Sequence, residues 1–194
     1  MKIKKIPVGQ SMLENLGDTE NAYEYIEDFI PWIGEIVVAF NGLESYLDSL
    51  LCETFSDRSD QKGLLVLHSM MYSTKVDLYK KFTDDFVRTF NWDIPNYKNL
   101  MSSLKECGDL RNKVVHANWA QTNSEGYTQI KYKLGANGLD HELCQFSVTS
   151  LEMIFKKIHE TSHALSDFEE ECQNRITEWN GEIANRNNIR NRSE

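Results

Sequence analysis

The chain has 194 residues, a length that fits one domain with a single buried core. Hydrophobic residues make up 40% of it and charged residues 26%, which is the composition of a globular protein. No apolar run approaches the ~20 residues needed to cross a bilayer, so we expect no membrane partner.

The net charge of −9 argues against broad electrostatic attraction to nucleic acid, because such binding depends on neutralising phosphates. Any contact with nucleic acid is therefore expected to be local, at one cleft or one face. The expected sources are the basic residues Lys98, Lys105, Arg111 and Lys113, or the tail residues Arg186, Arg190 and Arg192.

The cysteines and the N-terminus indicate a cytoplasmic protein. Cys52, Cys107, Cys144 and Cys172 are far apart and form no CxxC pair, which argues against a structural zinc site and a disulfide framework. The N-terminus, MKIKKIPVGQ, is positively charged but has no apolar stretch behind it, so it does not resemble a secretory signal. A reducing compartment fits both features.

The residue pattern in the first part of the chain predicts an irregular N-terminal arm and two helices. Residues 1–17 have little apolar periodicity, so we expect an irregular arm, followed by a short helix over 18–30 that Pro31 closes. A long amphipathic helix is predicted next, because apolar side chains recur every three or four residues. Its stripe is Ile33, Ile36, Val37, Phe40, Leu43, Leu47, Leu50 and Leu51. Residues 57–60 are expected to end it.

Three further helical segments are predicted before the pattern changes. The apolar run 64–71 indicates a short helix, and Ser73 has the character of an N-cap for the helix that follows. That helix is expected to end at 91–95. Its apolar face consists of Val76, Tyr79, Phe82, Phe86 and Phe90. The stripe of the next long helix is Tyr97, Leu100, Leu104 and Cys107, continuing towards Val114 and Val115.

The last third predicts a hairpin and a final helix. The β-prone runs 127–134 and 142–148 flank Gly135-Ala-Asn-Gly138, a good turn composition. Thr149 or Ser150 is expected to cap a long helix whose apolar stripe begins at Leu151, and residues 185–194 should form a frayed polar tail. The fold class is therefore mainly α. We expect a single domain over 18–184, an up-and-down helical bundle with one inserted β-hairpin at about 127–148.

A group of polar residues lies near the end of the third long helix, in DLRNKVVHANW over 109–119. Arg111 falls near the middle of the apolar stripe, where an unpaired charge is costly. Asn112 and His116 are four residues apart and share a face. Because His116 lies about 140° round the helix from Arg111, only the long arginine side chain or a second protomer could bring the two groups together.

This arrangement resembles the signature of the HEPN-domain family: an arginine, a polar residue, then a histidine after four intervening positions. The segment FNGLESYLDSLL is similar to the opening helix of the family, and the hairpin and final helix also resemble bacterial members, so that the likeness covers about 33–180. The resemblance implies a homodimeric, metal-independent endoribonuclease without a cofactor. It also implies a role as a toxin or in phage defence, with a possible antitoxin or defence partner protein.

The chemistry of the three residues suits RNA cleavage by the substrate's own 2′-hydroxyl, which leaves a 2′,3′-cyclic phosphate. Histidine can transfer protons near neutral pH, and the planar arginine fork can stabilise a charged phosphorane. The candidate catalytic residues are thus Arg111, Asn112 and His116. Weaker candidates for substrate contact are Lys113, Asn118 and Trp119. Asn118 stands where some HEPN toxins carry a tyrosine that a partner nucleotidyltransferase modifies, so we do not expect that regulation.

Three alternatives remain open. Arg111 could simply be a buried arginine paired with Glu44 or Glu35, and His116 a residue that ends the helix by bonding its last carbonyls. The chain could also be a non-catalytic HEPN dimer that binds a protein or a nucleotide. More remotely, His159-Glu160-Thr161-Ser162-His163 matches the H-E-x-x-H pattern of zinc proteases, in which two imidazoles share a helix face. Lysines precede this second motif and no third ligand is evident, so we expect no metal there.

Overall fold

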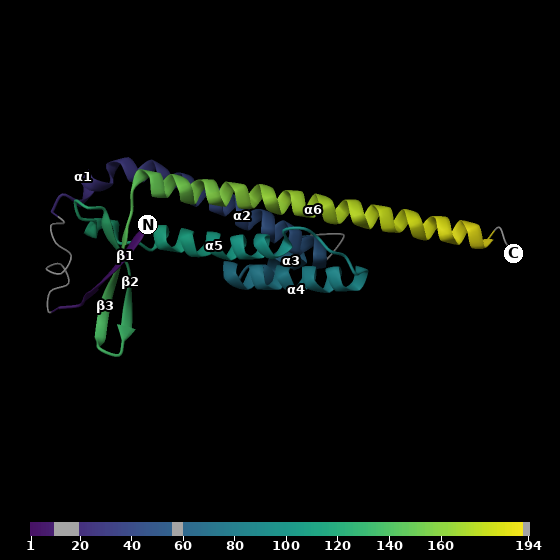
Figure 1. The fold of residues 1–194 in the computed structure, drawn as a ribbon, viewed down its shortest axis with the longest axis horizontal. Coiled ribbons are helices and arrows are strands. Elements are labelled where there is room, and N and C mark those ends of the chain that lie inside the picture. The colour runs from purple at the N-terminus through teal and green to yellow at the C-terminus, as the bar shows by residue number, and fades with distance from the viewer. Residues whose placement is uncertain (10–19, 56–59, 192–194) are drawn as a thin grey trace.

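The computed structural model describes residues 1–9, 20–55 and 60–191. It is mainly helical, with a small sheet at one end of the bundle and a C-terminal helix that extends past the other helices at the opposite end (Figure 1). Over the described residues, no helix has the length and apolar character that crossing a membrane would need.

The first helices differ from the expectation at Pro31. A short helix α1 (Ala22–Ile26) and a 3-10 turn η1 (Glu27–Phe29) lead directly into the long helix α2 (Ile30–Phe55). Pro31 therefore does not close a helix. It lies in the first turn of α2, where its missing N–H would have no partner within the helix in any case.

The middle helices lie close to their predicted positions. Residues 56–59, which include most of the predicted break, lie outside the described residues, and α3 (Asp60–Leu67) follows them. The next helix is α4 (Tyr72–Phe90), and Ser73 is not its N-cap. That position belongs to Met71, which has extended backbone and makes no capping bond through its side chain. The helix α5 (Tyr97–Val115) then matches the predicted third long helix.

The predicted hairpin is confirmed, but it is part of a three-stranded antiparallel sheet. Strands β2 (Tyr127–Gly135) and β3 (Gly138–Gln145) pair with each other. The strand β1 (Lys2–Pro7) pairs with the other edge of β3, from Lys2 opposite Gln145 to Pro7 opposite Asp140. The prediction of an irregular arm is therefore wrong for β1. The partner of this strand lies far along the chain, so local periodicity could not reveal it.

The last helix, α6 (Val148–Asn191), begins earlier and ends later than predicted. Ser147 caps it: the Ser150 N–H donates to Ser147 Oγ at 3.1 Å, and the Ser147 N–H donates to Ser150 Oγ at 2.9 Å. This reciprocal pair works as a capping box in which a serine replaces the usual glutamate. Neither Thr149 nor Ser150 is therefore the cap, and the helix extends to Asn191, past the predicted boundary at 184; residues 192–194 lie outside the described residues.

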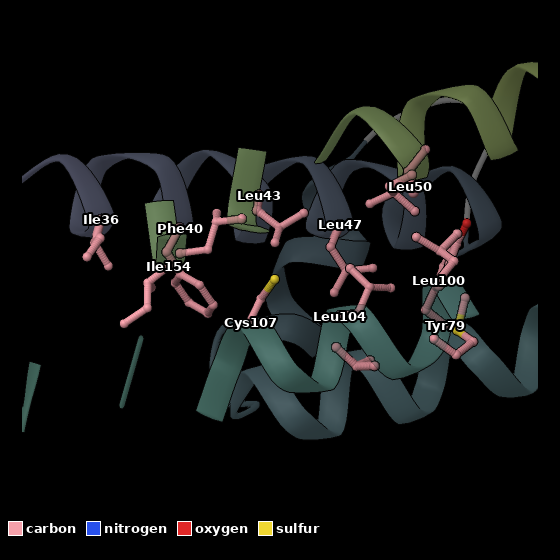
Figure 2. Packing of buried hydrophobic residues seen from close by; sticks show 14 of the residues in the cluster. Ile36, Phe40, Leu43, Leu47, Leu50, Tyr79, Leu100, Leu104, Cys107 and Ile154 are labelled. Atoms are coloured by element: carbon pink, nitrogen blue, oxygen red, sulfur yellow. The ribbon is translucent and has the colours of Figure 1, made fainter. Parts of the chain in front are cut away.

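The core lies between the long helices and consists of the predicted stripes. Phe40, Leu43 and Leu47 of α2 face Leu104 and Cys107 of α5 (Figure 2). The helix α6 covers the same cluster, and Figure 1 shows it running beside α2. The helix that carries the candidate motif is thus fixed by packed apolar side chains of α2 and α6.

The contact between α2 and α3 leads to a prediction about stability. An added Cβ at Gly63 would lie 2.6 Å from Cys52 Sγ and 2.9 Å from Cys52 Cα, and the backbone atom cannot move aside alone. Gly63→Ala should therefore lower the free energy of unfolding by about 1–3 kcal/mol, as measured by urea denaturation.

Gly42→Ala is the matched control, since nothing lies within 4 Å of a Cβ at that position in α2. This substitution should raise the free energy of unfolding by about 0.5–1 kcal/mol, because alanine favours helix interiors. A Gly63→Ala protein as stable as Gly42→Ala would contradict the close packing of α3 on α2.

Candidate functional site

The C-terminal end of α5 presents two polar side chains on one exposed face. His116 is the C-cap of this helix, and its backbone N–H donates to Asn112 O at 3.0 Å. Both side chains are exposed. Because they lie one helical turn apart at an open end of the helix, a ligand could contact both at once.

Arg111 lies next to this pair, with its guanidinium over an aromatic ring. Its Cζ is 5.2 Å from the centroid of the Phe40 ring in α2, and its Nη1 donates to Asn112 Oδ1 at 3.1 Å. The Nε atom is buried and has no hydrogen-bond partner among the described residues. The structure thus brings Arg111 and Asn112 together, whereas it shows no contact between Arg111 and His116.

Glu44 is not the partner of Arg111, contrary to the structural interpretation of this arginine. Its Oε1 contacts Lys75 Nζ of α4 at 2.9 Å, and Asp48 Oδ2 contacts the same Nζ at 2.8 Å. Burial acts to lower the pKa of Lys75, but the hydrogen bonds from Lys75 to Asp48 and Glu44 outweigh it, and the pKa is raised. Glu35 is exposed and makes no contact with Arg111 within the described part of the chain.

Trp119 anchors the chain where it leaves α5. Its Nε1 donates to Val114 O at 3.0 Å, and its ring packs against Phe146 with the centroids 4.8 Å apart and against Phe29 at 6.2 Å. It belongs to the short 3-10 turn η2 (Trp119–Gln121). These contacts give the ring a packing role, so it is a poor platform for stacking a base.

Asn118 and Lys113 connect the motif to the sheet. The Asn118 N–H donates to Gln129 O of β2 at 2.7 Å, while its side chain is exposed. Burial raises the pKa of the Cys144 thiol in β3, and the positive charge of Lys113 acts in the opposite direction. The backbone bond from Asn118 to Gln129 thus joins the segment after α5 directly to the sheet.

The second motif has the geometry expected of a helical pair but no complete metal site. The rings of His159 and His163 lie 4.6 Å apart on an exposed part of α6, and Glu160 is also exposed. Across the residues that the structure describes, no group of three or more histidine, cysteine or acidic side chains is placed to hold a metal ion. The zinc-protease interpretation lacks the third ligand that it requires.

The motif lies on an open surface rather than in a cavity. One cavity of about 580 Å³ lies between the start of α5 and α6, and another of about 440 Å³ lies between α4 and α6. Arg111, Asn112 and His116 line neither of them. An open site favours a long, flexible substrate over a small enclosed ligand.

The basic residues of the sheet are a feature that the sequence prediction missed. Lys105, an expected source of positive charge, is paired with Asp77 at 2.7 Å, and this hydrogen bond lowers the pKa of Asp77. Exposed lysines instead gather on β1 and β2. The cluster of three lysines in KIKKIP was visible in the sequence, but Ile3 and Ile6 are three residues apart and do not have the period of a strand.

Comparison of the chain with protein-family models, with curated proteins and with solved structures finds no match.

Proposed function

We propose that this chain is a homodimeric, metal-independent endoribonuclease of the HEPN type, which cuts single-stranded RNA in the cytoplasm as a toxin or in phage defence. The end of α5 carries the proposal. Exposed His116 and Asn112 lie there beside a guanidinium that has no carboxylate partner among the described residues. The hairpin between the motif helix and the last helix adds support, because the HEPN resemblance implies the same order of elements.

The proposed reaction uses the substrate's own nucleophile. An imidazole takes the proton of the 2′-hydroxyl as its oxygen bonds to phosphorus, and the bond from phosphorus to the 5′-oxygen breaks. An acid then protonates the departing 5′-oxygen, which leaves a 2′,3′-cyclic phosphate. Arg111 donates N–H groups to the phosphorane oxygens, and the bond from Arg111 to Asn112 orients the guanidinium for this task.

A second protomer would complete the site. One chain supplies one His116, whereas the reaction uses a base and an acid. A two-fold interface through the ends of α5 would bring two imidazoles to one phosphate. It could also provide an acceptor for the buried Arg111 Nε, which has none within the described residues of one chain.

A non-catalytic HEPN module is the second candidate, and the Phe40 contact favours it. An arginine with a purely structural role would also place its guanidinium over a core ring, as Arg111 does over Phe40. Such a module would bind a protein or a nucleotide as a dimer. The two candidates differ in whether Arg111 and His116 are needed for turnover.

We predict that the purified protein cleaves single-stranded RNA in the presence of EDTA and leaves 2′,3′-cyclic phosphate ends. His116→Ala should lower the rate by about 10²–10⁴, because it removes the proton-transfer group. Arg111→Ala should be comparably impaired, while Arg111→Lys should retain part of the rate, because a point charge cannot replace the bidentate fork. Asn112→Ala should lower the cleavage rate less than the other two alanine substitutions.

His68→Ala is the matched control for this experiment, because His68 is an exposed histidine just after α3 and away from the motif. Its rate should equal that of the wild type. If wild-type protein leaves RNA intact, or if the Arg111 and His116 alanine variants cut as fast as wild type, the nuclease assignment fails and the binding module replaces it.

We also predict a homodimer at micromolar concentration, since one chain carries only one copy of the motif. Light scattering coupled to size-exclusion chromatography measures this directly. A mass of one chain, 22.5 kDa, across the concentrations at which the protein cleaves RNA would refute the shared site.

A further inference from the structure

The three-stranded sheet is positively charged although the chain as a whole is acidic. Its strands contain five lysines and two carboxylates, a local excess of three positive charges in a chain of net charge −9. All five are exposed, on both faces of the sheet: the register places Lys2 and Lys4 on one face, and Lys5, Lys131 and Lys133 on the other. They lie on the two outer strands, while both carboxylates belong to the central strand β3.

The pairing of the strands leaves most of these charges uncompensated. Lys5 and Lys131 both lie opposite Glu142 in the register, and the salt bridge of Glu142 is to Lys131 at 3.2 Å. Lys4 instead has its Nζ 5.5 Å from the centroid of the Tyr127 ring. Tyr127 is half-buried, and lysines beside an accessible aromatic edge are a combination that binds phosphates and stacks bases in single-stranded nucleic acids.

The charged strands adjoin the candidate site. The backbone bond from Asn118 to Gln129 places β2 directly after the motif, and Lys131 follows two residues further on. Figure 1 shows the end of α5 beside the sheet, at the opposite end of the molecule from the C-terminus.

We propose that the lysines of β1 and β2, which project from both faces of the sheet, hold the phosphate backbone of single-stranded RNA as it enters the α5 motif. The choice of RNA among polyanions rests on the proposed nuclease function. A strand of six residues is about 20 Å long, enough for several consecutive phosphates. The overall negative charge then keeps RNA off the rest of the molecule, which confines binding to the sheet.

The test measures binding of a labelled single-stranded RNA by fluorescence anisotropy across a series of salt concentrations. The proteins are full chains in a His116→Ala background, so that cleavage does not interfere. The sheet variant combines Lys4→Gln, Lys5→Gln and Lys133→Gln. Its control, Lys62→Gln with Lys81→Gln and Lys156→Gln, removes the same charge from exposed positions on α3, α4 and α6.

The sheet variant should bind at least about tenfold more weakly, with a salt slope shallower by about 2, since each phosphate contact on a single strand contributes about 0.7. The control variant should bind like its parent, and arginine at the three sheet positions should preserve binding. Circular dichroism should show unchanged helix content in all of them, because the substituted lysines are exposed.

The inference would be overturned if the sheet and control variants lost RNA affinity equally. It would also be overturned if neither variant lost any affinity. Binding to phosphatidylserine vesicles without binding to RNA would also overturn it. The nuclease proposal fails separately. RNA held by the sheet but never cut by the wild type would contradict that proposal alone, whereas unimpaired cleavage by the sheet variant with His116 restored would contradict this inference alone.

Discussion

The position of Arg111 in the motif depends on its contact with the ring of Phe40. Tyr72 of α4 packs against it with the centroids 4.6 Å apart, and the guanidinium of Arg111 from α5 lies over it. The Tyr72 hydroxyl also donates to Leu104 O at 3.1 Å, so three helices meet at one buried side chain of α2. A cation over an aromatic face is stabilised without using its N–H donors. Phe40 can therefore hold Arg111 in place and leave most of its hydrogen bonds for a phosphate, which a carboxylate partner would not.

The acidic side chains of α2 are used elsewhere in the bundle. Lys75 of α4 is buried and forms salt bridges with both Glu44 and Asp48 of α2, so one cation links the two helices. Losing that lysine would leave two poorly solvated carboxylates facing each other, so this pairing is a strong constraint on the core. Its consequence for α5 is indirect. With Glu44 occupied, Arg111 stays without a carboxylate in the described part of the chain, and the end of α5 remains positive next to the lysines of the sheet.

Local patterns in the sequence predicted most of the helices and the motif, while contacts between distant segments escaped them. The apolar stripe from Ile33 to Leu51 was enough to predict α2, because a helical repeat can be recognised from residues close together in the sequence. The strand β1 was missed because its partner is β3, far along the chain. The choice of Lys75 over Arg111 as the partner of Glu44 was missed for a related reason: spacing assigns side chains to helix faces, but it does not say which of two facing cations lies within reach. The capping role of Ser147 depends on the start of α6, a boundary that periodicity leaves uncertain by a few residues.

The most direct test of whether Arg111 serves function rather than folding is the urea unfolding of Arg111→Met. Methionine keeps an apolar contact with the Phe40 ring and removes a buried Nε that has no acceptor. The free energy of unfolding should therefore stay within about 0.5 kcal/mol of the wild type or rise above it, as for a substitution that breaks no stabilising network. A loss of about 3 kcal/mol or more, the size expected when one partner of a buried ion pair is removed, would show that Arg111 holds the fold together and would contradict its assignment to the site.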